Sequence, residues 1–104
     1  MKLTLKCKEE FEKWFNKGSH DEEYNNHMGF KFERSHPSMQ YGVLVDFFDS
    51  VGLHIEDYYK TQFGKEKKEW MFCVNEDFND NGVETRQKAR TKAIEKANEI
   101  FNKQ

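Results

Sequence analysis

The chain has 104 residues, of which 36% are apolar and 35% are charged, against roughly 25% charged in a typical domain. This length predicts a single domain over residues 1–104. A net charge of −2 argues against a basic nucleic-acid-binding protein. An aromatic content of 15% argues against a disordered chain, because each large ring can bury roughly 150–250 Å².

The first segment is predicted to form a helix over about residues 5–17. Its apolar side chains fall on one helical face, and they are Cys7, Phe11, Trp14 and Phe15. Gly18 follows at the position where a left-handed residue commonly ends a helix.

The polar stretch 18–28 predicts a loop. Phe30 and Phe32 then alternate with charged residues, a pattern compatible with a short edge strand near residues 29–33.

A central helix is predicted over residues 37–50. Pro37 suits the first helical turn, and Ser35 is a candidate cap before it. Met39, Val43, Phe47 and Val51 recur every four residues, and further apolar residues flank them. A helix that is apolar on most of its circumference is expected to be buried on most of it. Gly52 is expected to stop this helix.

Two alternating segments, residues 53–60 and 69–74, predict the strands of an antiparallel hairpin. The tip between them is basic, with Lys65, Lys67 and Lys68.

Residues 75–82 are rich in Asn and Asp and predict a loop. Thr85 then caps a final helix over residues 86–102, whose apolar stripe is largely alanine. The whole pattern predicts an α+β fold in which three helices pack a small antiparallel sheet.

Arg86 and Arg90 fall within the apolar arc of the final helix. An unpaired buried charge is costly, so these arginines must pair or reach the surface. One interpretation, which we favour, is an ion-pair cluster with Asp46 and Asp49 of the central helix. The other is a contact to phosphate or to a partner near the helix N-terminus.

The basic residues of the hairpin tip and of the final helix form the candidate binding set. Lysines beside Trp70 are suited to hold a nucleic-acid backbone by charge and stacking, although Glu66 and Glu69 interrupt the run. The candidate residues are Lys65, Lys67, Lys68, Arg86, Arg90 and Lys92.

No pattern predicts a catalytic residue, a metal site or a cofactor. Asp77, Asn79, Asn81 and Gly82 match the opening of a calcium loop, but Lys88 stands where the loop needs a bidentate glutamate. Neither the histidines nor the two cysteines, Cys7 and Cys73, have metal-ligand spacing, and both cysteines are expected to be reduced and partly buried.

The N-terminus lacks the apolar run of a signal peptide, and no window has the ~18 apolar residues of a membrane span. We therefore expect a soluble, cytoplasmic protein without a membrane partner.

Two stretches, MQYGVLVDFFDSVG and TRQKARTKAIEKANEI, resemble shared segments of small uncharacterised phage and prophage proteins of the Bacteroides–Flavobacterium group. The resemblance implies a short accessory protein of a mobile element, in the cytoplasm of a bacterial host. That family carries no established catalytic residues, so the resemblance transfers none.

Three functions remain open. The first is a non-enzymatic protein that binds and inhibits a host protein or ribonucleoprotein, most specifically an anti-CRISPR-like inhibitor of an RNA-guided nuclease. The second is an RNA- or DNA-binding accessory protein. It is favoured by a helix–strand–strand–helix order that resembles a trimmed double-stranded RNA-binding domain, although that family usually has three strands. The third, a small enzyme, is the least favoured.

Overall fold

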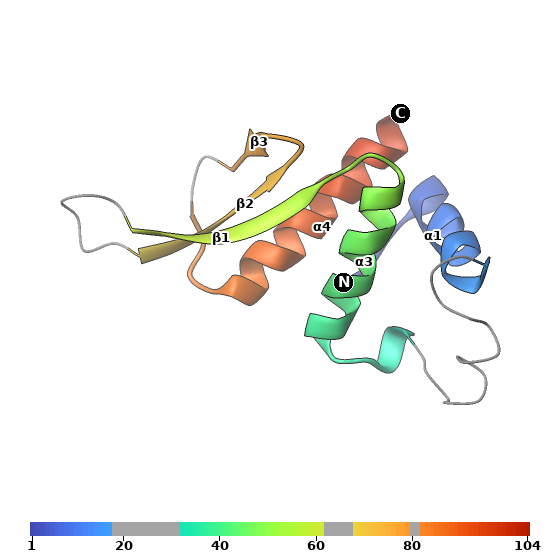
Figure 1. Cartoon of the computed structure of the whole chain (residues 1–104), viewed down its shortest axis with the longest axis horizontal. Coiled ribbons are helices and arrows are strands. Elements are labelled where there is room, and N and C mark those ends of the chain that lie inside the picture. The colour runs from blue at the N-terminus through green and yellow to red at the C-terminus, as the bar shows by residue number, and fades with distance from the viewer. Residues whose placement is uncertain (18–31, 62–67, 80–81) are drawn as a thin grey trace.

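The computed structural model describes residues 1–17, 32–61, 68–79 and 82–104. It has the predicted α+β arrangement of helices around a small antiparallel sheet (Figure 1). The elements in chain order are α1 (Leu5–Lys17), the 3₁₀ helix η1 (Phe32–Arg34), α3 (Pro37–Ser50), β1 (Ile55–Thr61), β2 (Lys68–Val74), β3 (Asp77–Phe78) and α4 (Arg86–Lys103).

The three long helices begin and end within one residue of their predicted bounds. Thr85 caps α4 as predicted, since its hydroxyl accepts a hydrogen bond of 3.1 Å from the Lys88 amide. The predicted cap of α3 was wrong. The cap is His36, whose Nδ1 accepts from the Ser38 amide at 3.1 Å, while Ser35 donates its hydroxyl to the Phe32 carbonyl. Beyond α3, Gly52 has a φ of +83°, so the chain turns where the glycine predicted.

The predicted hairpin is confirmed, with its strands at Ile55–Thr61 and Lys68–Val74. The two strands are antiparallel, and Tyr58 lies opposite Met71. The basic tip at residues 62–67 lies outside the described residues, as does the stretch 18–31 that holds the predicted first loop and Gly18.

Of the short edge strand predicted near residues 29–33, residues 29–31 lie outside the described part of the chain, and the rest is not a strand. Residues 32–34 form a 3₁₀ turn, closed by a hydrogen bond from the Ser35 amide to the Phe32 carbonyl. The third strand is instead Asp77–Phe78, inside the predicted loop, and it pairs with the end of β2. It forms because Asn75 and Glu76 both have positive φ and fold the chain back on itself in a two-residue turn.

The apolar core lies between the sheet and the helices. Helix α4 packs against β1 and β2 and also contacts α1 and α3 (Figure 1). Small side chains allow this close approach, because Ala89, Ala93 and Ala97 have no exposed surface. An aromatic cluster around Phe47 fills the helical end, with Phe11, Trp14, Phe48 and Phe101 at ring-centroid distances of 5.1–6.1 Å.

The buried stripe of α3 is narrower than predicted. It consists of Gln40, Tyr41, Leu44, Phe47 and Phe48. Met39 is 54% exposed and Val51 is also exposed, so the four-residue repeat alone did not locate the core face. The helix turns a polar face with Asp46 and Asp49 to solvent.

The N-terminal segment is held to α4 by side-chain amides. Asn98 Oδ1 accepts from the Thr4 amide at 2.9 Å, and Asn102 Oδ1 accepts from the Cys7 amide at 2.9 Å. These contacts join residues about 95 positions apart and fix the start of α1 against the last helix. Within the described residues, no helix is both long enough and apolar enough to span a membrane.

Candidate functional site

The structure brings together two of the predicted binding residues, Arg86 and Arg90, around one carboxylate of β1. Asp57 Oδ2 lies 3.8 Å from Arg86 Nε and 3.6 Å from Arg90 Nε. The hydroxyl of Tyr41 donates to the other oxygen of Asp57 at 2.9 Å. The cluster therefore joins α3, β1 and α4 at one point.

The predicted partners of the arginines, Asp46 and Asp49, were wrong. Both lie on the exposed side of α3, and Asp49 is 2.9 Å from His54 Nδ1 instead. The partner is Asp57 because strand alternation places its side chain on the face of the sheet that α4 covers. The sequence held a signal for this, since Asp57 lies in phase with Ile55 and Tyr59 on that face.

Both guanidinium groups also stack on aromatic rings. The Arg86 guanidinium carbon is 4.3 Å from the centroid of the Trp70 ring, and that of Arg90 is 4.6 Å from the Tyr41 ring. Arg90 Nε is buried and, among the described residues, has no hydrogen-bond acceptor. Burial and the neighbouring Asp57 raise the pKa of Tyr41 well above its ordinary value, so its hydroxyl stays a donor. These contacts support the structural interpretation of the two arginines.

The other predicted binding residues do not join this cluster. Lys92 is exposed on α4, Lys65 and Lys67 lie outside the described residues, and only the backbone of Lys68 is described. Lys88, in the first turn of α4, pairs with Glu84 at 3.2 Å. Arg86, Lys88 and Arg90 therefore each contact a carboxylate within the protein, with Asp57 shared by the two arginines.

The residues that resemble a calcium loop have structural roles. Asp77 pairs with Lys96 of α4 at 2.9 Å, and Asn79 Oδ1 accepts from the Phe72 amide at 2.8 Å. A side chain at Gly82 would collide with the side chain of Glu69, so this position requires glycine. Asn81 lies outside the described residues, and the part of the chain described holds no group of three potential metal ligands.

The face of the sheet opposite α4 is a second candidate surface that the sequence did not single out. We call it the open face, formed by Glu56, Tyr58, Lys60, Glu69, Met71, Cys73 and Phe78. The rings of Tyr58 and Phe78 meet edge to face at 6.3 Å, and their cross-strand partners, Met71 and Cys73, are nearly fully buried. Phe78 is nevertheless 53% exposed.

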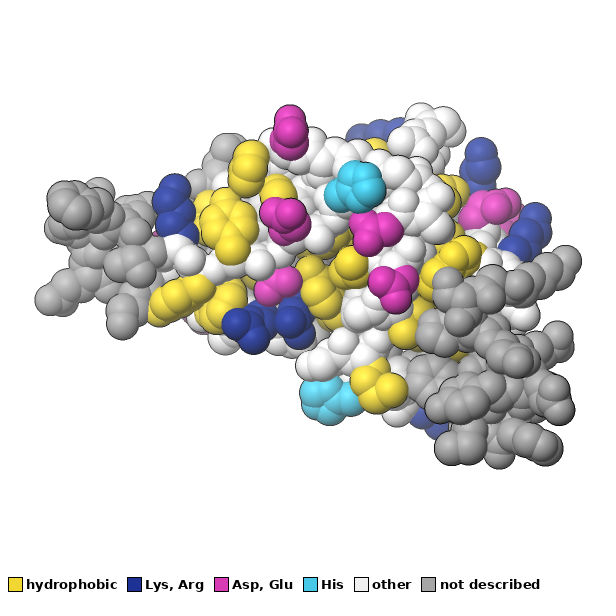
Figure 2. All heavy atoms as spheres, in the orientation of Figure 1, with side chains coloured by type: hydrophobic (Ala, Val, Ile, Leu, Met, Phe, Trp, Pro, Cys, Tyr) yellow, Lys and Arg dark blue, Asp and Glu magenta, His cyan; other side chains and the backbone are white. Residues whose placement is uncertain are grey.

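Acidic side chains gather on and beside the open face (Figure 2). We call Asp46, Asp49, Glu56 and Glu76 the acidic patch; all four residues are exposed. Asp49 is close to His54, whereas no lysine or arginine of the described part of the chain pairs with any of the four. Lys60 lies at the far end of the same face, so the acidic residues on and beside this face outnumber the basic ones.

Both cysteines are free, as predicted, and they are more deeply buried than the partial burial that the sequence led us to expect. Burial raises the pKa of the Cys7 thiol to about 12. Burial, and then the nearby Glu56, raise the pKa of the Cys73 thiol. Both thiols are therefore protonated and poorly nucleophilic at neutral pH.

Searches against family models, curated proteins and solved structures find no match to this chain.

Proposed function

We propose that this protein is a non-enzymatic accessory protein that binds and inhibits a basic host protein through its acidic patch. The observation that carries the proposal is the contrast in charge pairing. The arginines of α4 already have Asp57 as a partner, whereas the four carboxylates of the acidic patch have no lysine or arginine partner among the described residues. Uncompensated charge of one sign favours a partner of the opposite sign.

An exposed aromatic side chain supports a protein partner. Phe78 is 53% exposed and lies on the open face, beside the acidic patch. Aromatic side chains are enriched at the centres of protein interfaces, where they anchor the contact.

The most specific form of the proposal is inhibition of an RNA-guided nuclease in the cytoplasm of a bacterial host. Such nucleases hold nucleic acid in positively charged channels, and an acidic surface is complementary to a channel of that kind. The resemblance of residues 39–52 and 85–100 to phage and prophage proteins supports the same setting.

A charge-reversal experiment tests this function. Asp46→Lys/Asp49→Lys places two positive charges on the acidic patch, and Glu9→Lys/Glu12→Lys makes the same change, at the same spacing, on exposed positions of α1. We expect the wild type and the α1 variant to bind and inhibit a purified RNA-guided nuclease, and the patch variant to lose at least tenfold in inhibition. A rise in salt should weaken binding of the wild type.

Equal inhibition by both variants, or inhibition by neither the wild type nor the variants, would count against the proposed function. A host protein captured from lysate supports it only if the patch variant fails to capture that protein while the α1 variant captures it.

The second candidate is RNA or DNA binding by the hairpin tip and α4. The third strand favours it, because the order α3-β1-β2-β3-α4 has the three consecutive strands that the sequence pattern lacked. Lys92 offers a clean test, since its side chain is exposed and Lys92→Glu disturbs no described ion pair. Binding to double-stranded RNA at low salt that weakens in Lys92→Glu would support this candidate. No binding by the wild type at low salt would end it.

A further inference from the structure

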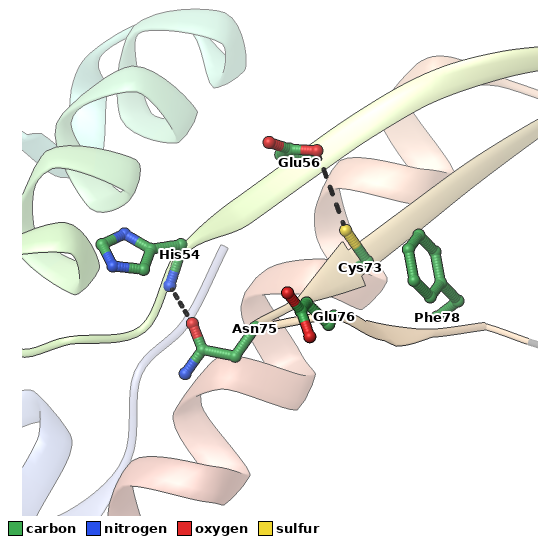
Figure 3. Close-up of a pocket in the computed structure, with 6 residues that line it drawn as sticks. All are labelled: His54, Glu56, Cys73, Asn75, Glu76 and Phe78. Atoms are coloured by element: carbon green, nitrogen blue, oxygen red, sulfur yellow. Dashed lines mark hydrogen bonds between the residues drawn. The ribbon is translucent and has the colours of Figure 1, made fainter.

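A hollow of about 480 Å³ lies at one end of the open face. It is lined by His54, Glu56, Cys73, Asn75, Glu76 and Phe78, which come from the start of β1, the end of β2 and the turn into β3 (Figure 3). A hollow of this size accommodates a side chain or a small ligand.

The hollow has two carboxylates and a neutral floor. Glu56 and Glu76 are exposed on opposite sides of it, and neither pairs with a lysine or arginine of the described residues. Cys73 lies between them, 5% exposed, with its thiol 4.0 Å from Glu56 Oε2. His54 is turned toward Asp49, 2.9 Å away, so a further carboxylate lies beside the rim.

An aromatic ring forms one wall. Phe78 is 53% exposed and stands across the hollow from His54 (Figure 3). The face of an aromatic ring attracts a cation electrostatically, and the attraction grows when the cation leaves water. A carboxylate pair and an aromatic wall together favour a planar cation.

Glu76 occupies its position at a conformational cost. It has a φ of +70° and follows Asn75 at +51°, in a two-residue turn where Asn-Gly is the favoured pair. Glycine would relieve the strain but would remove the carboxylate. Strained residues of this kind cluster at binding sites, where the surrounding structure holds them in place.

We propose that this hollow binds the guanidinium group of an arginine presented by the basic protein partner. Arginine is favoured over lysine because its planar group can hydrogen-bond to carboxylates and stack on a ring at the same time. The inference deepens the proposed function and rests on it for the identity of the partner, but the binding of the guanidinium can be measured separately.

The first experiment uses the full chain, labelled with ¹⁵N, and two short peptides. The probe is acetyl-Gly-Arg-Gly-amide, and its control is the same peptide with citrulline, which has the shape of arginine without its charge. We expect the arginine peptide to shift the amide resonances of residues 54–56 and 73–78, and the citrulline peptide to bind at least fivefold more weakly. Equal shifts with citrulline, or shifts as large at the exposed Glu9 and Glu12 of α1 as around the hollow, would overturn the proposal.

Three variants separate the hollow from general negative charge. Glu76→Gln removes one carboxylate and keeps the side-chain length, and Phe78→Leu removes the ring and keeps an apolar side chain. We expect each of these two variants to bind the arginine peptide at least threefold more weakly than the wild type does. Glu9→Gln makes the same charge change on exposed α1 and should leave the affinity unchanged. If Glu9→Gln weakened binding of the arginine peptide as much as Glu76→Gln does, the binding would depend only on net charge.

The same variants separate failure of the hollow from failure of the proposed function. If the partner nuclease binds Glu76→Gln and Phe78→Leu as tightly as the wild type, while Asp46→Lys/Asp49→Lys loses binding, the hollow is wrong and the function stands. If the arginine peptide shifts only the hollow but no nuclease is inhibited, the hollow stands and the proposed function falls.

Discussion

Acidic side chains on the two faces of the small sheet differ in their ion pairing. On the face covered by α4, Asp57 is bound by Arg86, Arg90 and Tyr41, so its charge joins three elements of the fold. On the open face, Glu56 accepts a weak hydrogen bond from the neutral Cys73 thiol and pairs with no lysine or arginine of the described residues. Glu56 and Asp57 are adjacent in sequence, and strand alternation alone turns Asp57 toward α4 and Glu56 toward solvent.

This contrast shows how a short chain with 35% charged residues can fold and still leave exposed carboxylates without a basic partner among the described residues. On the covered face, Asp57 pairs with Arg86 and Arg90, and this pairing limits the free-energy cost of burying their charges. The open face keeps its charges hydrated, where they cost the fold little and remain available. The following predictions test the contrast, from the largest effect to the smallest.

The largest difference in stability is expected between substitutions of two phenylalanines, one in the buried aromatic cluster and one on the open face. Phe47 is 1% exposed in the aromatic cluster, and Phe78 is 53% exposed on the open face. Phe47→Ala should lower the free energy of unfolding by about 3–5 kcal/mol, because it leaves a cavity. Phe78→Ala should lower it by about 1 kcal/mol or less. Urea unfolding followed by circular dichroism measures both, and Phe47→Leu serves if Phe47→Ala does not fold. Similar losses would mean that the open face is part of the core.

Substitutions of two aspartates compare the contribution of a paired and of an exposed carboxylate to stability. Asp57→Asn leaves two arginines without their carboxylate and should cost about 2–3 kcal/mol, less than for a fully buried pair because Arg86 is half exposed. Asp49→Asn removes an exposed contact to His54 and should cost at most about 0.5 kcal/mol. If Asp57→Asn were as mild as Asp49→Asn, the arginine cluster would not hold the fold together.

Alkaline pH should weaken the fold through Cys7. Its folded pKa is about 12 against an ordinary value of 9.0, so above pH 9 the unfolded thiol ionises while the folded thiol stays protonated. Stability is therefore fully present below pH 9 and falls by roughly 2 kcal/mol between pH 9 and 11. Tyr41, whose pKa is also raised, adds to the loss at the upper end of this interval. Unfolding curves at several pH values should show a shallower decline in Cys7→Ala, and an unchanged decline would refute the assignment.

Glycine at position 76 should stabilise the fold. Because Glu76 has a φ of +70°, Glu76→Gly relieves strain and should raise the free energy of unfolding by about 0.5–1 kcal/mol. The same change at Glu12, inside α1, should lower it by about 1 kcal/mol. Thermal melting reports both signs. A lower melting temperature in Glu76→Gly would show that the glutamate side chain stabilises the turn itself.

Periodicity predicted most of the fold. The spacing of Cys7, Phe11 and Phe15 identified α1, and the alternation around Trp70 and Phe72 identified β2, because a helix face and a pleated face repeat at different intervals. The third strand was missed because two residues are too few to show a period, and because its turn uses Glu76 where sequence rules expect glycine.

The candidate site was predicted less well. The sequence marked Arg86 and Arg90 as unusual, correctly, but assigned them Asp46 and Asp49 as partners. Helical periodicity shows that α3 has a polar side. It does not show whether that side faces another element or solvent. The acidic patch was missed altogether, since its members come from α3, from β1 and from the turn before β3, and no local pattern links them.

The sequence by itself determined the three long helices and the two strands of the hairpin, because local propensity and apolar spacing act over a few residues. It also determined that both cysteines would be free and that Thr85 would cap α4. Only the tertiary structure decided which charges are shared and which stay uncompensated, since Asp57 meets Arg86 and Arg90 across about thirty residues of chain. It also placed Glu56, Glu76 and Phe78 around one hollow, because only the folded sheet brings its open face into a single surface.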